Sequence, residues 1–290
     1  MPMPRDIGVI DLMMGLPIRD FHGTYEFLRA NLRDRESLEE FEFPAQYMFK
    51  DIPHPEPGGD PVAFLLGEMD RHGIERAMLG VRSGEGEGAR ALREHPDRFF
   101  GSIEVDPNRG MDAVRELQHA VEELGVKAAT AFPAGLNPQV PINDKKFYPV
   151  YAKCIELDVP ICVCAGVPGP RVPFAPQYVG LIDEVCWYFP ELKFVTRHGC
   201  EPWADLAVKL LLKWPNLYYS TSAFAPRYYP KAVVDFANTR GADKVMYAGY
   251  YPMGLSLDRI FKELPDVPFR DHVWPKFLRE NAQRVFKLDS

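Results

Sequence analysis

The sequence predicts an α/β fold, a (β/α)8 TIM-type barrel with a long cap insertion after its first strand. Short apolar runs alternate with longer amphipathic segments, and eight such runs occur along the chain. The length of 290 residues suits one barrel domain, and the hydrophobic content of 46% suits one large core. We therefore expect a single domain over residues 1–290, with the cap at 13–60.

The eight apolar runs are the candidate strands. They lie at residues 8–12, 76–81, 100–105, 126–131, 160–164, 193–197, 217–221 and 244–248. Segments between them, such as 61–72 and 111–121, carry apolar residues three and four positions apart, which is typical of amphipathic helices. Strands joined through such helices return to a parallel sheet, so we expect repeated βα units that close into a barrel.

The connection after the first strand is unusually long and rich in aromatic residues. These residues are Phe21, Tyr25, Phe41, Phe43, Tyr47 and Phe49. A segment this apolar does not stay solvated, and long connections of this kind usually have a function. Residues 51–60 contain three prolines and two glycines, which indicates a turn-rich hinge. We expect an ordered cap over the barrel mouth.

Composition excludes several classes of function. The formal net charge is −7, and no cluster of Lys and Arg suggests a nucleic-acid surface. No run of about 18 apolar residues occurs, and the start of the chain has no apolar signal segment, so we expect a cytoplasmic protein without a membrane partner. The five cysteines, at 154, 162, 164, 186 and 200, are expected to be reduced and mostly buried. A small-molecule partner fits this composition.

Five segments, in order along the chain, carry a family resemblance. They are His-Pro-Asp-Arg-Phe-Phe-Gly at 95–101, the stretch 147–160, Arg-His-Gly at 197–199, Trp-Pro-Asn-Leu-Tyr-Tyr at 214–219 and Asn-Ala-Gln-Arg-Val-Phe at 281–286. Together they resemble the amidohydrolase superfamily, and are most similar to the amidohydrolase-related branch that includes aminocarboxymuconate-semialdehyde decarboxylase, resorcylate decarboxylases and some lactone hydrolases. The resemblance implies a barrel enzyme that hydrolyses or decarboxylates a small carboxylate.

Members of that branch usually hold one divalent metal through a His-x-His pair after strand one, a His after strand five and an Asp after strand eight. The matching positions here are Met13, Gly15, Cys164 and Tyr250. These residues do not replace imidazole and carboxylate donors at neutral pH. The resemblance therefore predicts neither a metal nor another cofactor, and it places Met13, Cys164 and Tyr250 at the barrel mouth.

His198 is the leading catalytic candidate because it follows the sixth predicted strand, at the end of the barrel where active sites form. In related enzymes the matching histidine acts as an acid or base, and an ordinary imidazole pKa near 6.5 suits that role. A buried structural histidine is the alternative. Glu201 is a second candidate, able to orient the imidazole or to face solvent. Tyr250 either donates a hydrogen bond to a substrate oxygen or fills the emptied metal cavity.

Other residues are candidates for binding substrate. Cys164 is either a nucleophile or a small buried residue. Arg197 alternates with His198, so it should point away from the barrel interior unless the strand has already ended. Arginine suits carboxylate recognition, and aromatic residues at loop ends favour a flat, cyclic or aromatic carboxylate. The remaining candidates are Arg82, Lys127, Arg171, Arg227, Arg19, His22 and Trp203.

Three functions remain open from the sequence. The first is a metal-independent enzyme, either a lactone or ester hydrolase or a decarboxylase. The second is a catalytically inactive relative that binds a ligand or serves as the structural partner of an active paralogue. The third is a metalloenzyme with unexpected ligands, such as His22, His54, Cys164 and His198. We expect a homodimer, with assembly onto a paralogue as the alternative, because relatives are often dimers and aromatic runs such as 187–190 could form an interface.

Overall fold

The computed structural model describes residues 3–18, 20–39, 45–49, 52–56, 58–82 and 84–288, except the side chain of His22. Eight strands pair in sequence order, β1 to β8, and every ladder is parallel. The strands are β1 (Val9–Met14), β2 (Ile74–Val81), β3 (Phe99–Glu104), β4 (Val126–Ala131), β5 (Ile161–Cys164), β6 (Phe194–Arg197), β7 (Leu217–Ser220) and β8 (Val245–Met246). This arrangement confirms the predicted (β/α)8 barrel.

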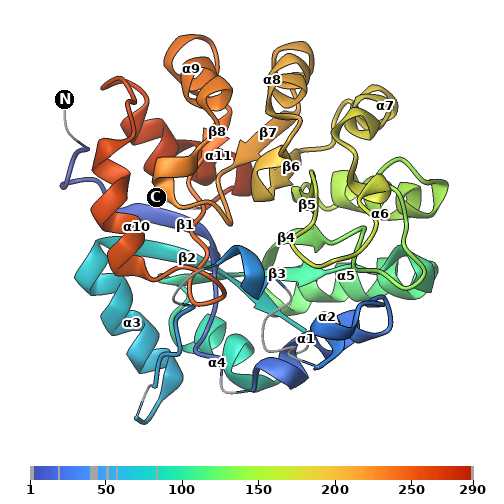
Figure 1. Cartoon of the computed structure of the whole chain (residues 1–290), viewed down its shortest axis with the longest axis horizontal. Coiled ribbons are helices and arrows are strands. Elements are labelled where there is room, and N and C mark those ends of the chain that lie inside the picture. The colour runs from blue at the N-terminus through green and yellow to red at the C-terminus, as the bar shows by residue number, and fades with distance from the viewer. Residues whose placement is uncertain are drawn as a thin grey trace.

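Helices surround the strands on all sides (Figure 1). They are α1 (Phe21–Arg29), α2 (Arg35–Glu39), α3 (Pro61–His72), α4 (Gly86–Glu94), α5 (Met111–Leu124), α6 (Tyr148–Glu156), α7 (Ile182–Tyr188), α8 (Ala204–Lys213), α9 (Lys231–Thr239), α10 (Leu257–Glu263) and α11 (Asn281–Phe286). Helix α3 has the predicted bounds because Asp60 caps the N–H of Val62 and Gly73 ends the helix in the left-handed conformation. No helix in the described part of the chain has the length and hydrophobicity needed to span a bilayer.

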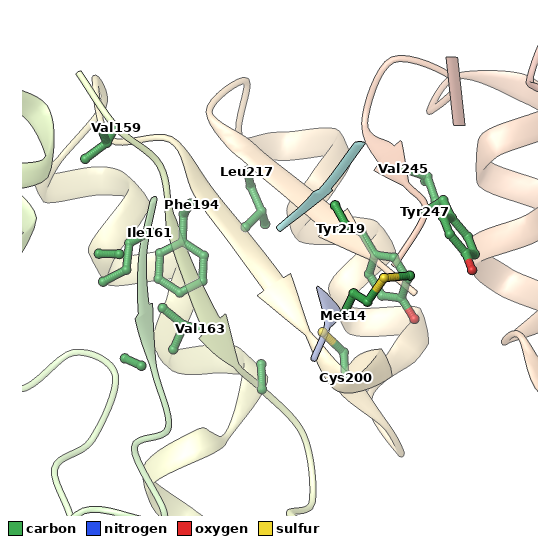
Figure 2. Close-up of a cluster of buried hydrophobic side chains, with 14 of the residues drawn as sticks. Met14, Val159, Ile161, Val163, Phe194, Cys200, Leu217, Tyr219, Val245 and Tyr247 are labelled. Carbon is green, nitrogen blue, oxygen red and sulfur yellow. The ribbon is translucent and has the colours of Figure 1, made fainter. Parts of the chain in front are cut away.

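Side chains alternate along each strand between the barrel interior and the outer helices. The interior cluster contains Ile10, Leu12, Met78, Phe100, Ala128, Cys162, Val195, Met246 and Ala248, together with Ala282, Val285 and Phe286 of α11. The outer cluster includes Ile161 and Val163 of β5 and Phe194 of β6, three of the side chains labelled in Figure 2. The alternation fixes which residue at the end of each strand points into the mouth.

The barrel closes between β1 and the segment after β8. Met14 forms a parallel bridge with Tyr251, and the N–H of Gly15 donates to the Tyr251 carbonyl at 2.8 Å. The buried Asp11 carboxylate strengthens this closure by accepting from Met13 N at 2.9 Å and from Gly249 N at 2.8 Å. Burial raises the pKa of Asp11 to about 7, opposed by these backbone N–H groups. Asp11 thus fixes the two chain segments that carry Met13 and Tyr250.

The segment after β1 packs on the loops that follow β4 and β5. Leu28 and Leu32 are buried against Phe132 and Val172. Asn31 Nδ2 donates to the carbonyls of Gly135 and Leu136 at 3.1 and 3.0 Å. The Tyr47 hydroxyl donates to the Gly169 carbonyl at 2.6 Å. These contacts hold the segment over one side of the mouth; Phe41 and Phe43, which we predicted to belong to the cap, lie outside the described residues.

Candidate functional site

Arg197 points into the barrel mouth, and not away from it as alternation with His198 predicted. On β6, Phe194 belongs to the outer cluster and Val195 to the interior cluster, so Arg197 has the inward orientation. Its Nη2 contacts the Met13 Sδ at 2.6 Å. Its Nε is buried and has no hydrogen-bond partner among the described residues. The alternation with His198 does not apply because β6 ends at Arg197, which is the exception that the expectation allowed.

Glu104 is the residue that sequence reasoning missed. It ends β3, two positions after Ser102 and four after Phe100, and Phe100 lies in the interior cluster. Glu104 therefore also points into the mouth. Burial raises the pKa of its carboxyl, while the positive charges of Arg197 and Arg82 oppose that rise. Residues 100, 102 and 104 share one face of the predicted strand, and this alternation was the signal in the sequence that could have identified Glu104.

His198 lies in a tight turn directly after β6. His198, Gly199 and Cys200 all have positive φ, at 63°, 80° and 60°. The backbone N–H of His198 donates to Ser222 Oγ at 3.0 Å, and its Nδ1 lies 3.2 Å from the same oxygen. The imidazole meets the Tyr250 ring edge-on, with ring centroids 5.4 Å apart. When Nδ1–H donates to Ser222, Nε2 keeps the free lone pair that a base requires.

The pKa of His198 is lowered to about 3, first by burial and then by the neighbouring Arg197 charge. The sequence-based argument used the ordinary value near 6.5, and this part of the expectation is corrected. The imidazole is neutral throughout the physiological pH range. It suits a base or a neutral hydrogen-bonding group rather than a cationic acid.

This shift predicts a pH dependence of stability. The unfolded chain takes up a proton at His198 below about pH 6.5, whereas the folded protein does so only near pH 3. The stabilising contribution of neutral His198 is therefore complete above about pH 6.5 and declines as the pH falls, by at most about 1.4 kcal/mol per pH unit. In His198→Asn the urea midpoint should fall less between about pH 7 and about pH 5 than in wild type. Equal falls in the two proteins would contradict the buried, neutral imidazole.

Cys164 and Tyr250 occupy the mouth in uncharged forms. Cys164 is 4% exposed, and burial raises the pKa of its thiol to about 12, partly offset by Arg197. A thiol held in this state is a poor nucleophile. Burial also raises the pKa of Tyr250, whose ring lies 5.6 Å from that of Phe49, centroid to centroid. Tyr250 therefore remains a neutral phenol, able to donate a hydrogen bond.

Two other residues from this region face elsewhere. The Glu201 side chain is exposed, and its carboxylate makes no hydrogen bond or ion pair with the described residues, while its backbone carbonyl accepts from Val167 N at 2.7 Å. Trp203 packs between Phe174 and Tyr178, with ring centroids 5.3 and 5.0 Å from its own. Among the described residues, neither side chain forms a hydrogen bond, an ion pair or a ring contact with His198.

Most of the remaining cationic candidates have other partners. Arg171 binds Asp34 and Glu36, each at 2.8 Å, and lies over the Tyr47 ring at 4.8 Å, so it ties the segment after β1 to the loop after β5. Arg227 pairs with Glu263 at 2.8 Å.

Lys127 lies at the opposite end of the barrel from the mouth. It is the second residue of β4, and it lines a recess with Arg76 and Lys287. Arg82 remains near the mouth, with Nη2 3.5 Å from the Thr24 carbonyl and its charge acting on Glu104. Arg19 and the side chain of His22 lie outside the described residues.

The residues at the mouth do not suit a divalent metal. Across the described residues, no group of three or more His, Cys, Asp or Glu side chains could hold a metal ion. Met13 and Cys164 offer a thioether and a protonated thiol, and the guanidinium of Arg197 lies against Met13. A fixed positive charge among such donors opposes the binding of a second cation. His54, an alternative ligand proposed from the sequence, packs on Phe21 with ring centroids 5.1 Å apart.

Comparison with known proteins found a matching family model and similar solved structures. The family model described as amidohydrolase matches residues 20–288. An uncharacterized TIM-barrel protein from Bordetella bronchiseptica is 21% identical, with a TM-score of 0.72, covering 96% of this chain and 98% of its own. The 5-carboxyvanillate decarboxylase from Novosphingobium aromaticivorans, solved with bound manganese, is 18% identical, with a TM-score of 0.70 and 98% of both chains covered. These two likenesses support the fold.

A third relative was found by sequence. It is the 2-keto-4-carboxy-3-hexenedioate hydratase of Sphingobium sp. (strain NBRC 103272 / SYK-6), 28% identical over 128 residues. The match spans 38% of this chain and 38% of the hydratase.

Proposed function

Because the chain belongs to the amidohydrolase family, we propose that it is a metal-independent enzyme that hydrolyses or decarboxylates a small carboxylate. The hydrolytic form of the proposal concerns a lactone or an ester-like bond. The substrate is cyclic or aromatic, in keeping with the aromatic rings of Phe49 and Tyr250 beside the mouth. The names of the decarboxylase and hydratase relatives, which both denote carboxylates, support this class of substrate.

One observation carries the proposal: a guanidinium and a neutral imidazole share the barrel mouth at adjacent positions of the chain. Arg197 reaches Met13, and its charge lowers the pKa of His198. Arg197 is half-buried and forms no ion pair with the described residues, and a partly desolvated cation in that state is costly in a folded protein. An anionic substrate, or an oxyanion that develops during the reaction, would supply the missing countercharge.

In hydrolysis, His198, Arg197 and Tyr250 have different roles. His198 takes a proton from water as the water oxygen attacks the acyl carbon. Arg197 and the Tyr250 phenol stabilise the negative charge that develops on the former carbonyl oxygen. In decarboxylation the same two groups hold the substrate while its C–C bond breaks, carbon dioxide leaves, and the carbon that keeps the electron pair takes a proton.

A catalytically inactive relative is the second candidate function. The substitution of all four positions that match the family's metal ligands, Met13, Gly15, Cys164 and Tyr250, favours it. Such a protein would bind a carboxylate in the same mouth without turning it over, or would support an active paralogue.

We also propose a homodimer that uses the exposed aromatic surface of α7. Trp187 and Tyr188 are 64% and 52% exposed, and their ring centroids lie 4.7 Å apart. Aromatic residues of this kind are enriched in subunit interfaces.

The experiment that tests the function is a turnover screen of lactones, esters and cyclic or aromatic carboxylates, using protein dialysed against EDTA. We expect turnover of at least one substrate without added metal, and loss of that turnover in His198→Ala. Binding of a carboxylate without turnover across the screen would support the inactive relative. Activity that appears only after addition of zinc or manganese would contradict metal independence.

A further inference from the structure

We propose that Glu104 is a second catalytic group, which donates a proton to the substrate while Arg197 binds the substrate's carboxylate. This inference rests on the proposed function, because it assigns a role in the same mouth. It adds a residue that the family resemblance does not suggest, and it pairs a proton donor on β3 with the base that follows β6.

The placement of Glu104 comes from strand geometry. Phe100 lies in the interior cluster, and Ser102 Oγ donates to the Leu79 carbonyl of the neighbouring strand at 3.5 Å. Glu104 continues this inward-facing row and pairs with Thr130 of β4. Its side chain is exposed to solvent, although enough protein surrounds it for burial to dominate its pKa. The carboxyl is therefore in contact with solvent at a position that is otherwise surrounded by protein.

Charged groups of neighbouring strands and loops act on this carboxyl. Arg197 of β6 and Arg82, directly after β2, favour its ionised form, and Asp106, two residues beyond Glu104, disfavours it. A negative charge on Glu104 also contributes to raising the pKa of the Cys164 thiol on β5. Glu104 nevertheless makes no hydrogen bond or ion pair with the described residues, and Arg197, which contacts Met13 Sδ and has an unpartnered Nε, makes no ion pair with them. The cation and the carboxyl are therefore both available to one ligand.

The other carboxylates of the region are less suitable proton donors. Asp11 is wholly buried, and it accepts hydrogen bonds from Met13 N and Gly249 N beneath the mouth. Asp106 caps the following turn by accepting from Asn108 N at 2.9 Å. Glu201 has an exposed side chain in the loop after His198. Among these described carboxyls, Glu104 alone is both at the inward-facing end of a strand and under the influence of the Arg197 charge.

The proposed proton transfers balance in both forms of the reaction. In hydrolysis, the water oxygen bonds to the acyl carbon and its proton goes to His198 Nε2. The acyl C–O bond then breaks with its electron pair on the leaving oxygen, which takes the proton of Glu104. The proton on His198 returns to Glu104 through solvent. In decarboxylation, the C–C bond breaks, its electron pair stays on the ring or chain carbon, and that carbon takes the Glu104 proton as carbon dioxide departs.

Calorimetry with benzoate tests this assignment without knowledge of the substrate. A benzoate carboxylate bound to Arg197 places a second negative charge near Glu104, which raises the pKa of that carboxyl further. We therefore expect wild-type protein to take up protons when it binds benzoate, measured by titration in buffers of different ionisation enthalpy. Glu104→Gln, which preserves shape, should bind benzoate at least as tightly and take up no proton. Arg197→Met and Arg197→Lys should weaken benzoate binding.

Control variants separate the groups involved. Glu191→Gln removes an exposed carboxylate outside the mouth and should retain the wild-type proton uptake. His198→Asn should also retain it, because a loss there would assign the proton to the imidazole and overturn the proposal. Unchanged uptake in Glu104→Gln, or no benzoate binding up to about 10 mM, would overturn it as well.

A kinetic measurement completes the test with any substrate that the turnover screen identifies. Glu104→Gln should lower kcat about 10²-fold with little change in KM, since the proton donor acts in the transition state. A wild-type KM and kcat in this variant would exclude Glu104 from the reaction. Failure of the screen would count against the proposed function alone, because the calorimetric result on Glu104 does not depend on turnover.

Discussion

Replacing His198 by alanine is expected to lower kcat/KM by about 10²–10⁴-fold, the range typical of a lost general base. The neutral imidazole has its Nδ1 beside Ser222 Oγ and a pKa lowered to about 3, so it is unprotonated at any pH at which the protein is used. Turnover of the screened substrate, measured under single-turnover and steady-state conditions, checks the prediction.

A second variant, His198→Asn, distinguishes a loss of catalysis from a loss of folding. His198 has a φ of 63°, a conformation that asparagine tolerates better than alanine does. His198→Asn should therefore keep the wild-type urea midpoint near neutral pH more closely than His198→Ala, while losing turnover to the same extent. Turnover close to wild type in a folded His198→Asn protein would remove the imidazole from the mechanism.

Gly166→Ala should cause a large loss of stability, about 3 kcal/mol or more, because two costs combine there. Gly166 has a φ of 103°, which disfavours any side chain. A Cβ at this position would lie 2.7 Å from the Glu201 carbonyl oxygen and 2.9 Å from Cys200 C, both in the backbone of the turn that follows His198. We expect a lower urea midpoint and reduced turnover, since the displaced turn carries the imidazole.

Gly125→Ala is the matched control for this variant. Gly125 also has a positive φ, of 67°, and no atom lies within 4 Å of a Cβ built on it. Its replacement should cost only the conformational penalty, about 1–2 kcal/mol, and leave turnover intact. Equal losses of stability in the two variants would show that the contact between Gly166 and the His198 turn is not tight.

The sequence predicts the barrel well because the relevant signals are local. Apolar runs mark the strands, and Asp60 and Gly73 mark the ends of α3. Strand ends are less predictable. The first strand continues to Met14, because Met14 forms a bridge with Tyr251. The last strand, β8, ends at Met246, because the N–H of Tyr247 donates to the Phe277 carbonyl and not to a neighbouring strand. Such partners lie far apart in sequence, so local pattern does not reveal them.

The site is only partly visible in the sequence, and the reasons are physical. The position of His198 follows from its place after a strand, but its pKa depends on burial and on the direction of Arg197. That direction requires knowing which residue of β6 faces inward. Lys127 was expected near the mouth, yet it stands at the amino end of β4, and Arg171 is held by Asp34 and Glu36. Charge alone does not tell a substrate-binding residue from a structural one.

The measurement that tests metal independence most directly is the metal content of the purified protein, by plasma mass spectrometry, before and after incubation with zinc or manganese followed by dialysis. The donor set at the mouth, with Arg197 against Met13, predicts less than about a tenth of an equivalent of divalent metal per chain in both samples. A full equivalent retained through dialysis would contradict the account, because it would require metal ligands at positions other than Met13, Gly15, Cys164 and Tyr250.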